Sequence, residues 1–566
     1  MAEDKIWFKS WPEGVKKSTN YPLVTLQEQF EKLVEKKPSM CFLTFLGMRY
    51  TFKEINEQAD RCATALYYLG VRKGDRIALF MPNVPQFVVA FYAALKVGAI
   101  VVPCNPLYGS EDLKFQLNDS GTKIILALDL LYSSVDKIRN ECPNLEYIIV
   151  TSVGELFPPI KRVLGHLLRR LPPRPHINPA DLNFFDLIEQ NEPLKLSIES
   201  NPKEDVVLLQ YTGGTTGRPK GAMLTHYNLI SNLTQAHEWL YQIVEENESF
   251  VGALPFFHLF GLMTILMAAI QFEATIHLVP DPRNFKMIFE IIEKERVSYL
   301  HGVPTLYLAL LNHPDFKKYD LSSLKACLSG AAPLAIQLVN DFEAAAGGEV
   351  MMIEGYGMTE LSPIATLSPF DRETRKIGSV GLPVLDTDIK IVDTDTGEEL
   401  AQGETGEIVV SGPQVMKGYW NRPEETTHAL REISGSIYMF TGDIGYMDED
   451  GYFYVVDRKK DMINVSGYKV FPREVEEVLF EHPAIKEAAV VGIPDEYRGE
   501  TVKAFVVLKE GHSLTQEELY EHCQSKIAKY KIPRKLEIRD SLPLTSVGKV
   551  YRKVLRAEEY SKKQKA

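Results

Sequence analysis

The sequence predicts an α/β protein with a large N-terminal domain of stacked α/β sheets, which includes a small β-barrel-like subdomain, and a mobile α+β C-terminal domain. Three observations predict this fold. Short apolar runs alternate with helical stretches over residues 51–310, as in parallel sheets covered by helices. Around 378–420 the pattern changes to short strands between Gly and Pro turns, and after 457 it changes to helices and strands of a compact module. We therefore expect domains at 1–457 and 458–566.

The first alternation lies between residues 51 and 150. The stretch TFKEINEQADRCATALYYLG begins at Thr51 and has apolar residues at spacings of three and four, so we expect Thr51 to cap a helix. The stretch VPQFVVAFYAALKVG predicts a second helix. Buried strands are predicted at RIALFM, AIVVPCN, KIILAL and LEYIIV.

Elements of residues 205–310, of the small β subdomain and of the C-terminal domain are predicted from the same kinds of pattern. A strand and then a loop are predicted at DVVLLQYTGGTTGRPKG, and a strand, a loop and an apolar helix from SFVGALPFFHLFG onward. Buried strands are predicted at ATIHLVP and VSYLHGVP. Short strands are predicted at DIKIVDTDTGEEL and GETGEIVVSGP, and a C-terminal helix and strands at REVEEVLFEHPAIKEAAVVGIPDE and KAFVVLKEG. TQEELYEHCQSKIAKYKIP predicts an amphipathic helix, and we expect the final SKKQKA to be a frayed tail.

Composition excludes several classes of protein. The net charge of −13 argues against a nucleic-acid partner. Six scattered cysteines without a C-x-x-C pair argue against a zinc site or a disulfide framework. The N-terminus MAEDKIW is acidic where a signal peptide would be basic. The longest apolar run, residues 259–270, has about 12 residues, whereas a spanning helix needs about 20. We expect a buried helix there and a soluble, cytoplasmic protein.

The stretch YTGGTTGRPKG, residues 211–221, carries the strongest chemical signal. Backbone N–H groups of a Gly-rich turn form an anion-binding concavity, to which Thr212, Thr215 and Thr216 add hydroxyls and Lys220 adds a charge. The stretch is not G-x-x-x-x-G-K-[ST], because Pro219 precedes the lysine. The alternative is a plain tight turn between a strand and a helix, but such a turn does not need three threonines. We therefore predict a phosphate-binding loop.

Four further stretches add candidate residues. In EGYGMTE, residues 354–360, an aromatic between two glycines can lie against a base, and Glu360 is a candidate ligand of Mg²⁺. In TGDIG, Asp443 can accept hydrogen bonds from ribose hydroxyls. DRKKDMINVSGYKV begins at Asp457, and PLTSVGKVYRKVL contains Lys549. Taken singly, these residues also have ordinary interpretations as a capping glutamate, a turn aspartate and a surface lysine.

In order and spacing, the five stretches resemble the superfamily of adenylate-forming enzymes, which comprises acyl-CoA synthetases, adenylation domains of peptide synthetases, and luciferases. The similarity runs from about residue 20 to residue 555 and is most marked for long-chain fatty-acid–CoA ligases. It implies that a carboxylate attacks the α-phosphorus of ATP to give acyl-AMP and pyrophosphate, after which a thiol displaces AMP. ATP, Mg²⁺ and coenzyme A are the implied cofactors. Because an anion must approach a polyanion, cations and N–H donors should dominate catalysis.

The resemblance also implies residue roles. Lys549 reaches the substrate carboxylate and the α-phosphate, Thr359 contacts the α-phosphate, and Glu360 binds Mg²⁺. His258 lies near the acyl carboxylate and moves for the thiol to enter, although a histidine satisfied within the core is the alternative. The implied ATP- and AMP-binding residues are Thr212, Gly213, Gly214, Thr215, Thr216, Gly217 and Lys220 around the β- and γ-phosphates; Gly330, Ala331, Ala332 and Pro333 on the adenine side; Tyr356, stacked on the adenine, with Glu354, Gly355, Gly357 and Met358; and Asp443 and Arg458 at the ribose.

Motion of the C-terminal domain is implied as well. Asp457 is the hinge, and rotation about it takes Lys549 out of the site and brings in Gly467, Tyr468 and Lys469, which form the tunnel for coenzyme A. The motif around Lys549 is a target of lysine acetylation in this superfamily, so we expect regulation there. Some fatty-acid ligases carry a gating tryptophan near PFFHLFG. Here Leu-Phe-Gly-Leu stands at residues 259–262, so no tryptophan gate is expected.

The sequence also restricts the identities of the acyl acceptor and of the acid substrate. Only residues 550–566 follow Lys549, so we expect no attached carrier domain and a diffusible thiol, coenzyme A or a separate carrier protein. No aspartate that would bind an α-amine stands in FFHLFGLMT or HGVPTLY, which favours an apolar acid. The alternatives are a medium-chain or aryl acid–CoA ligase, an acyl-AMP ligase that loads a carrier protein, and a non-catalytic binding homologue. A homodimer is left open.

One segment points to a membrane surface. In residues 158–175, PPIKRVLGHLLRRLPPRP, the apolar residues fall on one stripe of a helix and are flanked by Lys161, Arg162, Arg169 and Arg170. A basic amphipathic helix on an acidic protein is typical of peripheral membrane contact, and such segments recur in long-chain ligases. The alternative is an insertion that packs its leucines on the protein's own surface.

Overall fold

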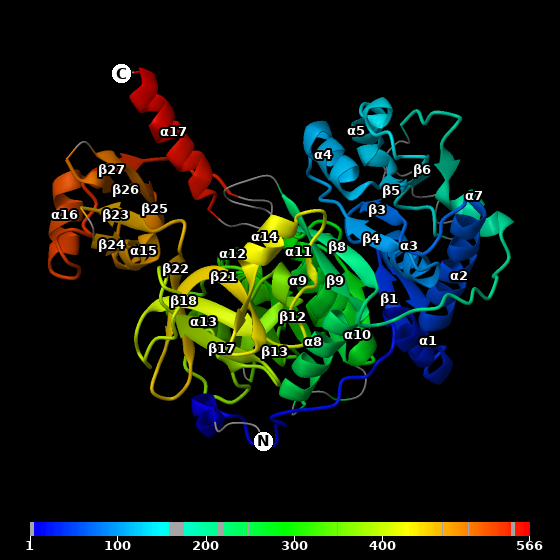
Figure 1. The fold of residues 1–566 in the computed structure, drawn as a ribbon, viewed down its shortest axis with the longest axis horizontal. Helices are drawn as coiled ribbons and strands as arrows, with labels where there is room; N and C mark the ends of the chain where they lie inside the picture. The colour runs from blue at the N-terminus through cyan, green and yellow to red at the C-terminus, as the bar shows by residue number, and fades with distance from the viewer. Residues whose placement is uncertain are drawn as a thin grey trace.

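The computed structural model describes residues 5–157, 175–212, 219–241, 243, 245, 248–347, 349–466, 468–495, 497–544 and 550–565. Four sheets organise this part of the chain, two of them large. Figure 1 shows the C-terminal module at one end of the molecule, next to the smaller sheet that carries β17, β18, β21 and β22. The predicted α/β fold class is confirmed.

The first large sheet contains the strands predicted between residues 51 and 150. Strands β8, β4, β3, β5, β6 and β7 run parallel, and most of their apolar side chains are buried. The strand order is β19 (Gly418–Tyr419), β9 (Lys220–Thr225), β8 (Val206–Thr212), β4 (Ile100–Pro103), β3 (Arg76–Phe80), β5 (Ile124–Leu128), β6 (Tyr147–Thr151) and β7 (Leu182–Asn183).

The second large sheet contains the later run of parallel strands. Strand β10 lies between β11 and β12 and pairs in parallel with both. Strands β1, β13 and β14 extend the parallel pairing on the two sides, and β2, β15 and β16 add antiparallel edges. The strand order is β16 (Leu382–Pro383), β15 (Ile364–Leu367), β14 (Met351–Gly357), β13 (Ala326–Ser329), β12 (Tyr299–Gly302), β10 (Ser249–Gly252), β11 (Thr275–Leu278), β1 (Cys41–Phe45) and β2 (Met48–Thr51).

Helices cover both large sheets. The predicted cap is confirmed, because the Thr51 hydroxyl accepts from the Glu54 N–H and the Glu54 carboxylate accepts from the Thr51 N–H in a capping box. The helices of this part are α1 (Leu26–Lys36), α2 (Phe52–Tyr68), α3 (Pro85–Lys96), α4 (Ser110–Ser120), α5 (Tyr132–Asp136), α7 (Phe184–Gln190), α8 (His226–Trp239), α9 (Leu259–Gly261), the π-helical turn η4 (Leu262–Met267), α10 (Ala268–Gln271), α11 (Phe285–Glu295), α12 (Pro304–Leu311), α13 (Ile336–Ala346) and α14 (Pro423–Ala429).

Two smaller sheets follow. The first is the expected β subdomain, an antiparallel sheet of β17 (Asp388–Val392), β18 (Gly406–Ser411), β20 (Leu430–Ile433), β21 (Ser436–Met447) and β22 (Phe453–Arg458). The C-terminal module contains β23 (Ile463–Val465), β24 (Tyr468–Val470), β25 (Ile485–Asp495), β26 (Gly499–Leu508) and β27 (Lys535–Ile538), with α15 (Pro472–Phe480), α16 (Gln516–Gln524) and α17 (Arg552–Lys565).

One local expectation is wrong. Residues 561–565 form the end of helix α17, not a frayed tail. Its Lys562 ammonium pairs with Glu559 at 2.7 Å and Glu537 at 3.2 Å, and the fully buried Leu555 anchors the helix. The strand predicted ahead of the loop is confirmed as β8, whereas the alternative of a turn between a strand and a helix is not. The stretch 211–221 connects β8 to β9, which run antiparallel, with Thr212 opposite Lys220.

The predicted apolar helix within residues 259–270 is confirmed as α9, η4 and α10, whose side chains are almost all buried. In the part of the chain that the structure describes, no helix is both long and apolar enough to span a bilayer.

Candidate active site

Three predicted stretches meet at the carboxyl ends of β13 and β14. A Cβ on Gly330 would lie 3.2 Å from the Gly355 carbonyl oxygen and 3.3 Å from the Phe260 ring. The aromatic-rich stretch 255–261, the GAAP stretch and the EGYGMTE stretch are therefore in contact. The GAAP stretch is residues 330–333. Ala331, with φ of +69°, begins a bend in it, and Ala332 and Pro333 follow. Ligands of open α/β sheets bind at this edge.

Gly357 has a steric reason to be glycine. A Cβ at this position would lie 1.8 Å from the Pro363 carbonyl oxygen, because β15 folds back antiparallel onto β14. The close approach positions Tyr356 on one side of Gly357 and Met358 and Thr359 on the other. All three residues remain half-buried at the mouth of the site.

Asp443 lies at the centre of a hydrogen-bonded group. The Tyr356 hydroxyl donates to Asp443 Oδ2 at 2.8 Å, and Arg458 Nε pairs with Oδ1 at 2.6 Å. Asp443 and Arg458 face each other directly across strands β21 and β22. The structure thus brings together the residue predicted to stack on adenine and the two predicted to hold the ribose. Because both carboxylate oxygens have partners, the aspartate is held in one orientation.

Glu354 is a buried acid in the middle of β14. Burial raises its pKa from the ordinary value of 4.5 to about 8, although the positive charge of Arg473 and the Leu334 N–H, 3.4 Å from Oε1, oppose this shift. The side chain is therefore mainly protonated at neutral pH and can both donate and accept a hydrogen bond. This protonation state was not anticipated from the sequence.

Glu360 lies in the turn after β14 and is only 5% exposed. Its Oε1 accepts a hydrogen bond from the Tyr419 hydroxyl at 2.7 Å. Burial raises the pKa of Glu360, while the Tyr419 hydrogen bond and the charge of Arg458 lower it. The Lys220 ammonium lies over the Tyr419 ring, 5.1 Å from its centroid. Tyr419 therefore connects the end of the phosphate-loop stretch to the predicted metal ligand.

The donor set fits Mg²⁺ bound with a nucleotide. Among the described residues no group of three or more His, Cys, Asp or Glu side chains could hold a metal ion alone. Mg²⁺ commonly uses one or two carboxylates, with phosphate oxygens and water supplying the remaining ligands. Glu360, connected through Tyr419 to the end of a phosphate-loop stretch, fits that pattern.

His258 begins the apolar helix beside these stretches. Its Nδ1 accepts a hydrogen bond from the Phe260 N–H at 3.2 Å, so the imidazole caps α9. The π-helical turn η4 follows directly, and a Cβ on Gly261 would lie 2.5 Å from the Pro255 carbonyl oxygen. π-helical turns occur frequently at functional sites. The capping bond holds His258 half-buried beside the stretch that contacts Gly330.

Several predicted residues lie outside the described part of the chain. Thr212 and Lys220 are described and face each other at the ends of β8 and β9. Outside the described residues lie Gly213, Gly214, Thr215, Thr216 and Gly217 of the phosphate loop, Lys549, Gly467, and residues 158–174 of the predicted membrane segment.

Asp457, the predicted hinge, carries a buried carboxylate in β22. Oδ1 accepts from the Arg458 N–H and Oδ2 from the Arg473 N–H, both at 2.7 Å, and Arg552 Nη1 lies 3.5 Å from Oδ1. Burial raises the pKa of Asp457 to about 6, against the charge of Arg552. Arg473 and Arg552 thus tie the carboxylate to the C-terminal module, whereas Arg458 is the next residue of β22.

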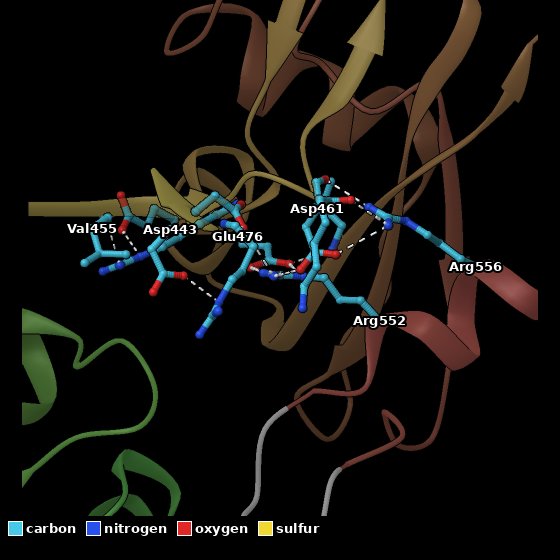
Figure 2. Close-up of polar contacts among 12 residues, drawn as sticks. Asp443, Val455, Asp461, Glu476, Arg552 and Arg556 are labelled. Carbon is cyan, nitrogen blue, oxygen red and sulfur yellow. Dashed lines mark hydrogen bonds and ion pairs between the residues drawn. The ribbon is translucent and has the colours of Figure 1, made fainter. Parts of the chain in front are cut away.

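Figure 2 shows the polar network next to this carboxylate, in which Arg552 and Arg556 extend from α17. Arg552 Nη2 pairs with Glu476 Oε2 at 2.6 Å and Nη1 lies 3.7 Å from Asp461 Oδ2. Arg556 Nη1 lies 3.4 Å from Asp461 Oδ1. The network joins the start of α17 to α15 and to the segment after the hinge.

The two described residues of the predicted tunnel are exposed. Tyr468 stacks on Tyr530 with ring centroids 4.8 Å apart. Lys469 Nζ donates to Thr394 Oγ1 at 3.1 Å and lies 3.6 Å from Asp395 Oδ2, in the loop between β17 and β18. In this arrangement Lys469 contacts the small β subdomain instead of Glu360 or Asp443.

Sequence reasoning missed two residues. Tyr419 stands in MKGYWNRPEET and Arg552 in KVYRKVL, and neither type in isolation indicates a site. Their partners lie 59 and 76 residues away in the chain. The one available signal for Arg552 was its position three residues after Lys549.

Two family models match most of the chain. The family model of the AMP-binding enzyme matches residues 30–420, and the model of the AMP-binding enzyme C-terminal domain matches residues 474–549. The chain therefore belongs to the AMP-binding enzyme family.

Individual relatives and solved structures show which members of the family the chain is similar to. The chain is 42% identical over 566 residues to a long-chain-fatty-acid–CoA ligase of Bacillus subtilis (strain 168), covering 99% of each chain. It is similar to ATP-bound MatB from Rhodopseudomonas palustris, with a TM-score of 0.83 and 28% identity over 94% of this chain and 99% of that one. A Mycobacterium tuberculosis fatty acyl CoA synthetase matches with a TM-score of 0.72 and 28% identity, over 95% and 99% of the two chains.

Proposed function

We propose that this protein activates a long-chain fatty acid with ATP through an acyl-adenylate and then transfers the acyl group to coenzyme A, releasing AMP and pyrophosphate. The observation that carries the proposal is the assembly of Tyr356, Asp443 and Arg458 beside the buried Glu360, in a chain whose full-length relatives include long-chain-fatty-acid–CoA ligases. We assign Glu360 to the metal and the phosphates and Asp443 to the ribose. Glu360 lies in the turn after β14, and Asp443 lies in β21.

We assign residue roles in the first half-reaction from the resemblance, and the contacts among the described residues support them. Asp443, held by Arg458, accepts from the ribose hydroxyls, and the Tyr356 ring lies against the adenine near Gly330, Ala331, Ala332 and Pro333. Lys220 and the loop that begins at Thr212 hold the departing phosphates. Thr359 contacts the α-phosphate.

Lys549 supplies the cation that offsets charge at the substrate carboxylate and the α-phosphate. One such group aimed at developing charge is worth about 10²- to 10³-fold in rate. Glu360 would hold Mg²⁺ together with phosphate oxygens, and the bound ion would neutralise phosphate charge. His258 lies on the acyl side, where release of its bond to the Phe260 N–H would let the ring move for the thiol.

Domain rotation about Asp457 separates the half-reactions, with domains at 1–457 and 458–566. The two family models leave residues 421–473 between them, and this interval contains the hinge. After rotation Lys549 leaves the site and Gly467, Tyr468 and Lys469 line the path of coenzyme A. The contacts of Lys469 with Thr394 and Asp395 must break for this to happen.

The hinge is tested by Asp457→Pro, with Asp457→Asn as the matched control. The proline variant should form acyl-AMP nearly as wild type and lose thioester formation, because a fixed φ blocks the change of backbone torsion. The asparagine variant loses the charge but keeps the backbone freedom, so it should retain both half-reactions to a greater extent. Equal loss of both half-reactions in the proline variant would refute the hinge.

Membrane contact through residues 158–175 is a separate part of the proposal. Its support is the sequence pattern alone, a basic amphipathic stripe on a chain of net charge −13. Changing Arg169 and Arg170 to Glu should weaken co-sedimentation with anionic vesicles and leave binding to neutral vesicles unchanged. Identical sedimentation on anionic vesicles would count against it.

The alternatives are distinguished by the acceptor and the acid. A carrier-loading enzyme would form acyl-AMP but give no acyl-CoA, and a non-catalytic homologue would release no pyrophosphate with oleate and ATP. A medium-chain or aryl acid–CoA ligase would prefer shorter or aromatic acids. Pyrophosphate release measured with and without coenzyme A, on oleate, octanoate and benzoate, separates all four.

A further inference from the structure

Tyr419 links two parts of the site that are far apart in sequence. Its hydroxyl donates to Glu360 Oε1 at 2.7 Å, while its ring lies under the Lys220 ammonium at 5.1 Å. The backbone of Tyr419 is fixed as well, because β19 pairs with β9 and the Tyr419 N–H donates to Thr426 Oγ1 at 2.9 Å. The side chain is 8% exposed. A single buried residue thus contacts both the metal-side carboxylate and the phosphate-side lysine.

The surroundings of Glu360 explain why such a donor matters. The carboxylate is almost completely buried, and a buried charge is costly unless it is hydrogen-bonded. Arg458 is the cation whose charge favours the ionised form, but its guanidinium is already paired with Asp443, and the Asp443 carboxylate repels Glu360. The Tyr419 hydroxyl donates directly to Oε1, and together with the Glu360 backbone N–H it favours the ionised carboxylate.

We propose that Tyr419 is a positioning residue for the metal–phosphate part of the reaction: its hydroxyl orients the Glu360 carboxylate and its ring holds Lys220 at the same phosphates. This inference rests on the proposed function, because it assumes that Glu360 faces Mg²⁺ and that Lys220 faces ATP. Tyr419 acts through these two residues and does not contact the substrate itself.

Tyr419→Phe removes the hydroxyl and keeps the ring, so it separates the two contacts. Binding of ATP is measured by equilibrium dialysis without fatty acid, in the presence and absence of MgCl₂. We expect the variant to bind ATP without Mg²⁺ as wild type does. Adding Mg²⁺ should increase the ATP affinity of the variant about tenfold less than it increases that of the wild type, which is the scale of one hydrogen bond to a charged group. The MgCl₂ concentration for half-maximal pyrophosphate release with oleate should rise by a similar factor, and saturating MgCl₂ should restore most of the rate.

The matched control is Tyr438→Phe. Tyr438 also donates to a carboxylate, Asp388 Oδ2 at 2.7 Å, and is 3% exposed, but it lies in the small β subdomain. Tyr438→Phe should leave the Mg²⁺ dependence unchanged. Tyr419→His is a second variant, in case the phenylalanine variant does not fold, because its ring N–H can still donate and should retain part of the Mg²⁺ effect.

A double-mutant comparison completes the test. In a Glu360→Gln background, Tyr419→Phe should cause no further change in Mg²⁺ dependence. Independent effects, or an unchanged Mg²⁺ dependence in the single Tyr419→Phe variant, would overturn the inference. Failure of the wild type to release pyrophosphate from oleate, ATP and Mg²⁺ would instead overturn the proposed function, so the two failures are distinguishable.

Discussion

Glu354→Gln tests the electrostatic description of the adenine side of the site. Glu354 is 8% exposed, and burial raises its pKa from 4.5 to about 8. The substitution replaces a protonated acid by a neutral side chain of nearly the same shape. The amide oxygen of glutamine can still accept a hydrogen bond from the Leu334 N–H, which donates to Oε1 in the wild type. The variant should therefore fold as wild type does.

The expected effect follows from proton linkage. The folded-state pKa lies above the unfolded value, so ionisation of Glu354 costs stability, and the free energy of unfolding should fall as pH rises from about 4.5 to about 8. Between pH 6 and pH 8 this single group accounts for a loss of about 2 kcal/mol. Glutamine has no proton to lose, so the variant should lack this part of the pH dependence.

The assay is urea unfolding of wild type and variant at pH 6, 7 and 8, followed by tryptophan fluorescence. The stability difference between the two proteins should change by about 2 kcal/mol across this range, in favour of the variant at high pH. Parallel pH profiles of the two proteins would refute the conclusion that Glu354 is buried in its protonated form.

Three further predictions concern other parts of the molecule. Arg552→Gln leaves the buried carboxylates of Glu476 and Asp457 without their shared cation, so it should destabilise the C-terminal module by about 3 kcal/mol or more. The control Lys562→Gln changes a pair whose lysine is 58% exposed and should change stability by less than about 0.5 kcal/mol. Equal effects of the two variants in thermal unfolding would contradict the network. Gly357→Ala places a Cβ 1.8 Å from the Pro363 carbonyl oxygen and should abolish ATP binding. The control Gly109→Ala, whose Cβ would have its nearest neighbour 4.0 Å away, should not. A fully active Gly357→Ala enzyme would refute the close packing of Gly357 against Pro363. Stoichiometric acetylation of Lys549 removes its charge and should lower acyl-AMP formation by about 10²-fold or more; unchanged adenylation would exclude the proposed role of this lysine.

Much of the fold could be predicted because its signals are local. The capping box at Thr51 and the buried strands β3 to β6 each depend on residues within one short window. The stretch 211–221 was harder to interpret, since its Gly and Thr pattern does not say which element follows. The structure shows that Lys220 opens an antiparallel strand that pairs with β8.

The site was predictable as a set of residue types but not as a network. The approach of Asp443 to Arg458 is a consequence of the β21–β22 register, which composition does not encode. The Tyr419 contact with Glu360 and the Arg552 contact with Glu476 depend on tertiary folding over 59 and 76 residues. The protonation of Glu354 likewise depends on burial, which only the packed structure reveals.

The central claim is that this chain joins a long-chain fatty acid to coenzyme A through an acyl-adenylate. The most direct measurement is ATP-dependent thioester formation with purified protein, Mg²⁺, coenzyme A and saturated acids of six to twenty carbons, with AMP and pyrophosphate measured in the same reactions. Acyl-CoA, AMP and pyrophosphate should form in equal amounts, and kcat/KM should be highest among the longer acids. Formation of ADP and phosphate, or a preference for the shortest acids, would contradict it.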